Sequence, residues 1–206
     1  FIKKYKEHIE SIGASFFEVM TVMAVWYFSE KKIDYAIMET GLGGKFDSVT
    51  ACGANIIGIT PISMDHAHIL GNNILEIANE KIEAIKHKST VFSVLQLKEI
   101  NEKIKKKCIS NNSKLSFIET DDKVETSLEG EHQKQNASLA LEISKNILKS
   151  NSHNLKSCLM SINWYGRNQT ISTSPDIIFD VDSTVLSVES LEVIMEPSFA
   201  KDLKLE

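Results

Sequence analysis

The stretch METGLGGKFDSVT, residues 38–50, decides how the fold is interpreted. A run of apolar residues ends there in a carboxylate, Glu39, and three glycines follow within four positions, Gly41, Gly43 and Gly44. A short apolar run predicts a strand that is buried on both faces of a sheet. Glycines allow close backbone approach and positive φ angles. An acid at the tip of a buried strand, followed by a loop with few side chains, therefore predicts a ligand site at that tip.

Strands and helices are expected to alternate on either side of this stretch. The predicted strands cover residues 34–40, 55–60, 90–95, 114–119 and 175–182. The predicted helices cover residues 15–29, 73–86, 97–111, 132–149 and 185–194. Surface connections are expected at residues 119–131 and 151–157. Such alternation predicts an α/β fold, with a mostly parallel layered sheet and helices on both of its faces.

Composition bounds the class of protein. The chain has 206 residues, 42% of them hydrophobic and 25% charged, and a net charge of -5, which argues against a protein that coats nucleic acid. No apolar run reaches the length of a membrane span, and no secretory signal is evident. The three cysteines, Cys52, Cys108 and Cys158, form no C-x-x-C pair, so we expect neither a disulfide framework nor a zinc site. We therefore expect a cytoplasmic protein without nucleic-acid or membrane partners.

A second acid and an imidazole follow the next strand. Asp65 and His66 come just after residues 55–60, and ligands of open parallel sheets bind at the carboxyl ends of strands. Together with Glu39 they predict a hard cation such as Mg²⁺ bound to phosphate. Singly, each residue has a plainer interpretation: the glycine loop as a tight turn, His66 as a structural residue, Lys81 as a solvated charge and Asn136 as an ordinary polar helix position.

The order and spacing of four motifs resembles one family. The motifs are SFFE at 15–18, ETGLGGKFDSVT at 39–50, MDHAHILG at 64–71 and IANEKIEAIK at 77–86. They resemble the patterns T-F-F-E, E-x-G-L-G-G-R-x-D-x-T-N, L-D-H-x-x-x-L-G and I-A-x-E-K-x-x-I-I-K of folylpolyglutamate synthase and dihydrofolate synthase, which are Mur ligases. Weaker matches follow at GEHQKQNASLAL, 130–141, and WYGRNQ, 164–169.

This resemblance implies an ATP-dependent amide ligase. ATP would phosphorylate a carboxylate of folate or dihydropteroate to an acyl phosphate, and the amine of L-glutamate would then attack it. The implied cofactors are ATP and Mg²⁺, and the implied state is a monomer. Residues 1–170 would correspond to the Mur ligase central (ATPase) domain without its P-loop part, and residues 171–206 to a truncated start of the C-terminal ligase domain.

The resemblance also implies roles for individual residues on the metal side. Glu39 and His66 would be Mg²⁺ ligands, with His66 counted among the catalytic residues. Lys81 matches a lysine that is carbamylated in the family, and as an anion it would support a second Mg²⁺.

Other residues would contact the nucleotide and the substrate. Asn136, Arg167 and Asp180 match residues that bind ATP. The glycines Gly41, Gly43 and Gly44 would lie near the phosphates and the substrate, and Asp47 would lie near the pterin end of the folate.

The chain departs from the family pattern in four places, one of which is the expected C-terminal domain that stops after about one strand and one helix. The phosphate-cradling stretch G-T-N-G-K-G-S is absent from the sequence. The family's D-G-A-H-N is replaced by DVDST at 180–184, and an arginine of the glycine loop by Lys45. We therefore expect residues 1–206 alone to be inactive. Two alternatives stay open: a degenerate, non-catalytic remnant of the same family, and a Mur-type ligase that acts on cell-wall precursors.

Overall fold

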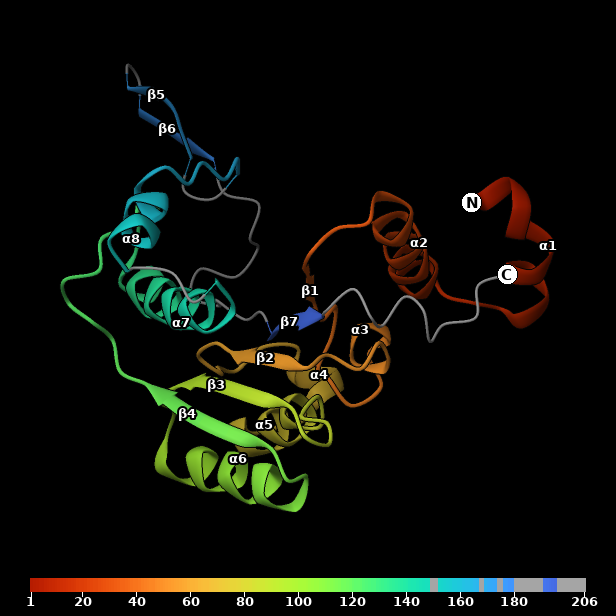
Figure 1. Cartoon of the computed structure of the whole chain (residues 1–206), viewed down its shortest axis with the longest axis horizontal. Helices are drawn as coiled ribbons and strands as arrows, with labels where there is room; N and C mark the ends of the chain where they lie inside the picture. Colours follow the sequence, from red (N-terminus) through yellow and green to blue (C-terminus); the bar gives the residue numbers. More distant parts are fainter. Residues whose placement is uncertain (149–151, 167–168, 174–175, 180–190, 196–206) are drawn as a thin grey trace.

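The central sheet of the computed structural model has five strands in the order β1-β7-β2-β3-β4 (Figure 1). The structure describes residues 1–148, 152–166, 169–173, 176–179 and 191–195. The strands are β1 (Ala36–Glu39), β2 (Ile56–Ile59), β3 (Thr90–Val94), β4 (Lys114–Ile118) and β7 (Leu191–Met195). Strands β2, β3 and β4 pair in parallel, and β7 is antiparallel to both β1 and β2. Four of these strands therefore run in one direction, which confirms the predicted α/β fold with a mostly parallel sheet.

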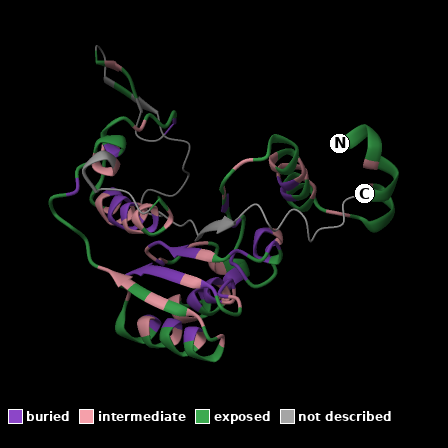
Figure 2. Ribbon diagram, viewed as in Figure 1, coloured by how far each residue is buried: buried purple, intermediate pink, exposed green. Residues whose placement is uncertain are grey.

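Helices cover both faces of this sheet (Figure 1). Helix α7 (Glu131–Leu148) packs on one face, and α5 (Ile74–Ile82) and α6 (Lys98–Ser110) pack on the other. Strand β3 explains the division, because successive side chains of a strand point to opposite faces. Val91 packs in the core beneath α5 and α6, whereas Phe92 and Val94 pack with Leu139 and Ile143 of α7. Buried residues accordingly gather in the strands and on the helix surfaces that meet them (Figure 2).

The N-terminal helices are α1 (Ile2–Ile12) and α2 (Phe16–Lys31). A capping box begins α2: the Ser15 hydroxyl accepts from the Glu18 amide, and the Glu18 carboxylate accepts from the Ser15 amide. Within α2 only Thr21 and Val25 are buried. The Thr21 hydroxyl lies 2.7 Å from that of Ser48, at the start of the short helix α3 (Ser48–Ala51), so α2 is anchored where the glycine loop ends.

The expected connection at residues 151–157 is wrong, because α8 (Ser152–Met160) is a helix there. Its Leu159 packs in a cluster with Val124, Ala137 and Leu141 of the preceding loop and α7, and Leu155 packs against that cluster. Leu155 and Leu159 are four residues apart, so they lie on one face of a helix, although serines and asparagines surround them in the sequence.

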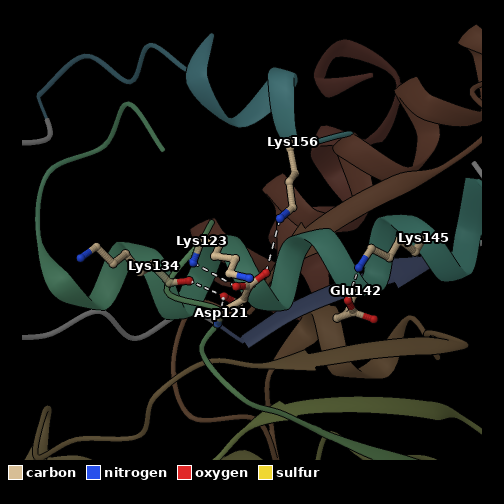
Figure 3. A network of polar contacts seen from close by, with 7 residues as sticks. Asp121, Lys123, Lys134, Glu142, Lys145 and Lys156 are labelled. Carbon is tan, nitrogen blue, oxygen red and sulfur yellow. Dashed lines mark hydrogen bonds and ion pairs between the residues drawn. The ribbon is translucent and has the colours of Figure 1, made fainter. Parts of the chain in front are cut away.

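A polar network joins α8 to the loop before α7 (Figure 3). Asp121 accepts from the Lys123 amide at 2.9 Å and from the Lys156 ammonium at 3.4 Å. The Asp121 amide in turn donates to the Ser138 hydroxyl of α7 at 3.1 Å. The bond from the Lys123 amide, and after it the bond from the Lys156 ammonium, hold the pKa of the Asp121 carboxyl below its ordinary value. The predicted loop at 119–131 is therefore ordered by contacts with both helices.

Two further expectations near the end of the chain need correction. The strand expected at 175–182 exists as β6 (Asp176–Phe179), but it pairs with β5 (Gln169–Thr173) in a separate two-stranded sheet. The helix expected at 185–194 is wrong where the structure describes it, because residues 191–195 form β7. The β-branched pair Val193 and Ile194 favours a strand there. The division into domains at residue 170 stays a prediction.

The three cysteines are thiols, and they differ in environment. Cys52 and Cys108 are buried in the core beneath α5 and α6, whereas Cys158 on α8 is exposed. Burial raises the pKa of the Cys108 thiol to about 11. Burial, and then the nearby Asp47 charge, raise the pKa of the Cys52 thiol. Within the described residues, no helix combines the length and apolar character that a membrane crossing requires.

Candidate functional site

The glycine loop after β1 is packed tightly against two helices. A Cβ on Gly41 would lie 2.7 Å from the Phe17 ring of α2. A Cβ on Gly43 would lie 2.9 Å from a methyl carbon of Leu70, in the short helix α4 (Ala67–Leu70), and the φ of Gly43 is +66°. The positive φ favours glycine at position 43, and a Cβ there would also displace the Leu70 methyl. The loop therefore touches the helix that directly follows His66.

At Gly44 the same loop lies against the backbone of α5, the helix that carries Lys81. A Cβ at this position would lie 2.8 Å from the carbonyl oxygen of Lys81 and 2.9 Å from that of Glu80. These atoms are backbone atoms of α5, so the loop and the helix are in direct main-chain contact. The segments that present Glu39, His66 and Lys81 consequently converge on one loop of four residues.

Glu39 lies at the end of a strand, as the sequence predicted, but the expected burial of that strand on both faces is wrong, because Ile37 of β1 is 66% exposed. Glu39 is the last residue of β1, at the carboxyl end of a strand, and its side chain is exposed. Ligands of open α/β sheets bind at that end. The carboxylate is therefore placed where a solvated cation or a phosphate-bound metal could reach it.

His66 is held by its neighbour in the chain. Its Nε2 lies 3.4 Å from Oδ2 of Asp65, and its amide donates to Oδ1 of Asp65 at 2.7 Å. Its backbone has a φ of +47°, which is uncommon for a residue with a side chain. In a neutral imidazole with its proton on Nε2, the Nδ1 lone pair would be the one that a metal could use. The imidazole is half exposed, so it is accessible to one.

Lys81 lies in the last turn of α5 and is only 8% exposed. Asn73 caps the start of this helix, because its Oδ1 accepts from the amides of Leu75 and Glu76, each at 3.1 Å. A buried ammonium is costly unless it is compensated. Burial of Lys81 beside the glycine loop sets it apart from the solvated lysines of α6.

Asn136 of α7 has an unusual polar atom. Its Oδ1 is buried and makes no hydrogen bond within the part of the chain that the structure describes, while its Nδ2 donates to Gln133 at 3.5 Å. Buried acceptors without a donor are rare and ask for an explanation. An N–H donor of a bound molecule would satisfy this oxygen. The helices that carry Asn136 and Lys81, α7 and α5, lie on opposite faces of the sheet (Figure 1).

Asp47 has partners that sequence reasoning missed. Its carboxylate accepts from the amides of Gly41, Leu42 and Val49, at 2.8, 3.0 and 2.8 Å, and it caps α3. An aspartate directly before a short helix is the signal that could have revealed the cap. The contact with the loop amides could not be found that way.

Two candidate residues, Arg167 and Asp180, lie outside the described residues. Their roles therefore stay predictions. Among the described residues, no three histidine, cysteine, aspartate or glutamate side chains gather as a metal cluster. The metal roles of Glu39 and His66 stay predictions.

Known proteins that resemble this chain in sequence and fold are named folylpolyglutamate synthase. No family model matches the chain. A dihydrofolate synthase/folylpolyglutamate synthase of Bacillus subtilis is 31% identical over 236 aligned residues, which cover 97% of this chain and 55% of the relative. A folylpolyglutamate synthase of Candida albicans is 29% identical, with 96% and 43% covered. The chain thus spans about half the length of the curated relatives it matches.

Solved structures confirm the fold. Folylpolyglutamate synthase of Mycobacterium tuberculosis complexed with ADP and AMPPCP superposes with a TM-score of 0.76 at 23% identity, over 86% of this chain and 47% of that one. The similarity in sequence extends over nearly all of this chain, through all four motifs that surround the glycine loop. The chain belongs to the family of folylpolyglutamate and dihydrofolate synthases.

Proposed function

We propose that the protein that carries these residues is an ATP-dependent ligase. It adds L-glutamate to a carboxylate of folate or dihydropteroate through an acyl phosphate. The observation that carries the proposal is the main-chain contact of Gly44 with Glu80 and Lys81, because it joins the strand end at Glu39 to the helix of Lys81. Leu70 against Gly43 adds the segment of His66 to the same place.

The residues present fit the group that this reaction needs. Glu39 and His66 would hold Mg²⁺, whose charge would neutralise phosphate oxygens during phosphoryl transfer. A carboxylate and an imidazole at the edge of a sheet leave the other coordination positions to phosphate and water. The contact between Asp65 and Nε2 of His66 would help to orient the imidazole for the metal.

Lys81 and Asn136 would serve the nucleotide side of the reaction. Carbamylation of Lys81 would exchange a buried cation for an anion that can support a second Mg²⁺. The unsatisfied Oδ1 of Asn136 would accept a hydrogen bond from ATP. Arg167 and Asp180 would contact the same nucleotide, and we propose a monomer that works in the cytoplasm.

Glu39→Gln tests the assignment. Glutamine keeps the size of the side chain but removes the anionic ligand, so we expect the rate of ADP formation to fall at least about 100-fold. The assay contains ATP, Mg²⁺, L-glutamate and either dihydropteroate or tetrahydrofolate, with the gene product that carries residues 1–206. Mass spectrometry identifies the product as the pteridine substrate extended by one glutamate.

Glu30→Gln is the matched control, because it makes the same chemical change at an exposed position of α2 and should leave the rate unaltered. Equal rates for the wild type and Glu39→Gln would contradict the metal role of Glu39. ADP formation that requires a cell-wall precursor, with none from the pteridine substrates, would establish the Mur-type alternative instead.

A further inference from the structure

Three polar side chains at the start of α7 form a relay of contacts that ends on Asn136. Nε2 of Gln133 lies 3.1 Å from Nε2 of His132, and Oε1 of Gln133 lies 3.5 Å from Nδ2 of Asn136. Gln133 and Asn136 are three residues apart, so their side chains lie on one face of the helix. Gln133 is only 6% exposed. A buried glutamine therefore links an imidazole to the residue with the unsatisfied oxygen.

The direction of the relay follows from which atoms can donate. An amide nitrogen of glutamine only donates, so Nε2 of His132 accepts and the ring proton lies on Nδ1. Oε1 of Gln133 only accepts, and it faces the amide nitrogen of Asn136. The 3.5 Å contact is long, so it acts by orientation: a reversed Asn136 amide would set two acceptors against each other. Asn136 consequently turns its own acceptor, Oδ1, away from the relay.

His132, at the other end of the relay, is held by the glycine before α7. A Cβ on Gly130 would lie 2.6 Å from Cε1 and 3.0 Å from Nδ1 of the imidazole, so the ring rests against the Gly130 backbone. The φ of Gly130 is +114°, which favours glycine at this position. The Gln133 amide donates to the carbonyl oxygen of Gly130 at 3.0 Å. The beginning of the relay is thus fixed against the main chain.

Oδ1 of Asn136 is left as an acceptor that needs a donor. It has no hydrogen bond within the described residues, although the residue as a whole is only partly buried. A purine with a 6-amino group, such as adenine, offers an N–H donor at its edge, whereas a 6-oxo purine offers an acceptor there. Two acceptors that face each other away from water are costly, because neither is satisfied. This oxygen therefore distinguishes the two kinds of purine.

We propose that Gln133 is a positioning residue that makes the site select a 6-amino purine nucleotide, because it holds the Asn136 amide with Oδ1 toward the base. The inference rests on the proposed function, in which Asn136 contacts ATP, and it names the group of the nucleotide that is recognised. Gln133 itself does not touch the nucleotide. Without its oxygen, the Asn136 amide is free to turn over and to pair with either kind of purine.

Gln133→Met tests this role, because methionine keeps the length of glutamine but replaces the amide with a thioether, which is only a weak acceptor. The probes are ADP and inosine diphosphate (IDP), whose purines carry an amino and an oxo group, respectively, at the 6-position. Calorimetric titration in the presence of Mg²⁺ gives the Kd of each for the gene product that carries residues 1–206. We expect the wild type to bind ADP at least about tenfold more tightly than IDP, and Gln133→Met to bind the two within about threefold.

Gln133→Glu and Gln135→Met are the matched controls. Glutamate keeps an oxygen that faces Nδ2 of Asn136, so this variant should still prefer ADP at least about fivefold. Gln135→Met makes the same chemical change two residues away on α7, where the side chain points to another side of the helix, and should match the wild type. A general loss of stability would weaken the binding of both nucleotides alike and leave the ratio of their Kd values unchanged.

Two results would overturn the inference. One is a ratio in Gln133→Met that equals the ratio of the wild type, including a wild type that binds ADP and IDP alike. The other is a ratio that falls as far in Gln135→Met as in Gln133→Met. Failure of the proposed function looks different: the wild type would prefer ADP and lose that preference in Gln133→Met, yet it would form no ADP from ATP with L-glutamate and the pteridine substrates.

Discussion

Alanine in place of Gly44 is expected to lower the free energy of unfolding by about 1–3 kcal/mol. The added Cβ would lie 2.8 Å from the carbonyl oxygen of Lys81, 2.9 Å from that of Glu80 and 3.2 Å from the α-carbon of Lys81. Backbone atoms of a helix cannot rotate away as a side chain can, so the loop or α5 has to move. The change should appear as a lower urea midpoint of unfolding.

Gly41→Ala provides the matched comparison. Its Cβ would meet the Phe17 ring at 2.7 Å, which is nominally closer, but this ring is 39% exposed and can turn toward solvent. Both substitutions reduce the entropy of the unfolded chain by the same amount. We therefore expect a loss below about 1 kcal/mol at position 41. Equal losses at the two positions would show that the loop is not held against the backbone of α5.

Ile104→Ala is expected to cost about 2–5 kcal/mol, the larger of the two effects. Ile104 on α6 is fully buried, at 0% exposure, in the core between the helices and the sheet. Truncation removes its apolar contacts and leaves a cavity that a close-packed interior fills only in part. Urea unfolding followed by circular dichroism measures the loss.

Ile109→Ala on the same helix is its control. Ile109 is 79% exposed, so the same atoms are removed from solvent-facing surface. The change should stay within about 0.5 kcal/mol of the wild type, as is usual for surface positions. A loss at position 109 comparable to that at 104 would contradict the packing of α6 described here.

Local pattern predicted much of the fold, and the misses have physical causes. The apolar runs of β2 and β3 and the capped start of α5 are visible in the sequence, because burial and capping depend on neighbouring residues. The position of β7 between β1 and β2 is not visible in the sequence. It depends on pairing with strands more than 130 residues earlier in the chain, which local patterns do not encode. Short apolar segments are also ambiguous between helix and strand, which accounts for the error at 191–195.

The candidate site divides in the same way. The order of motifs pointed to Glu39, His66 and Lys81, and the structure brings their segments together around the glycine loop. Nothing in the spacing of residues could show that Gly44 touches the backbone of Glu80 and Lys81. Such contacts become visible only once the loop is folded.

Because the three thiols differ in burial, their rates of reaction with a labelling reagent report on how often the folded core opens. Cys158 should react at once with a thiol reagent, since it is exposed, whereas Cys52 and Cys108 can react only when the core beneath α5 and α6 opens. Their labelling rates therefore measure local and global fluctuations in the native state. The first label is expected on Cys158 of α8. The slower rate at which Cys52 and Cys108 are then modified would measure how often the core beside the glycine loop opens.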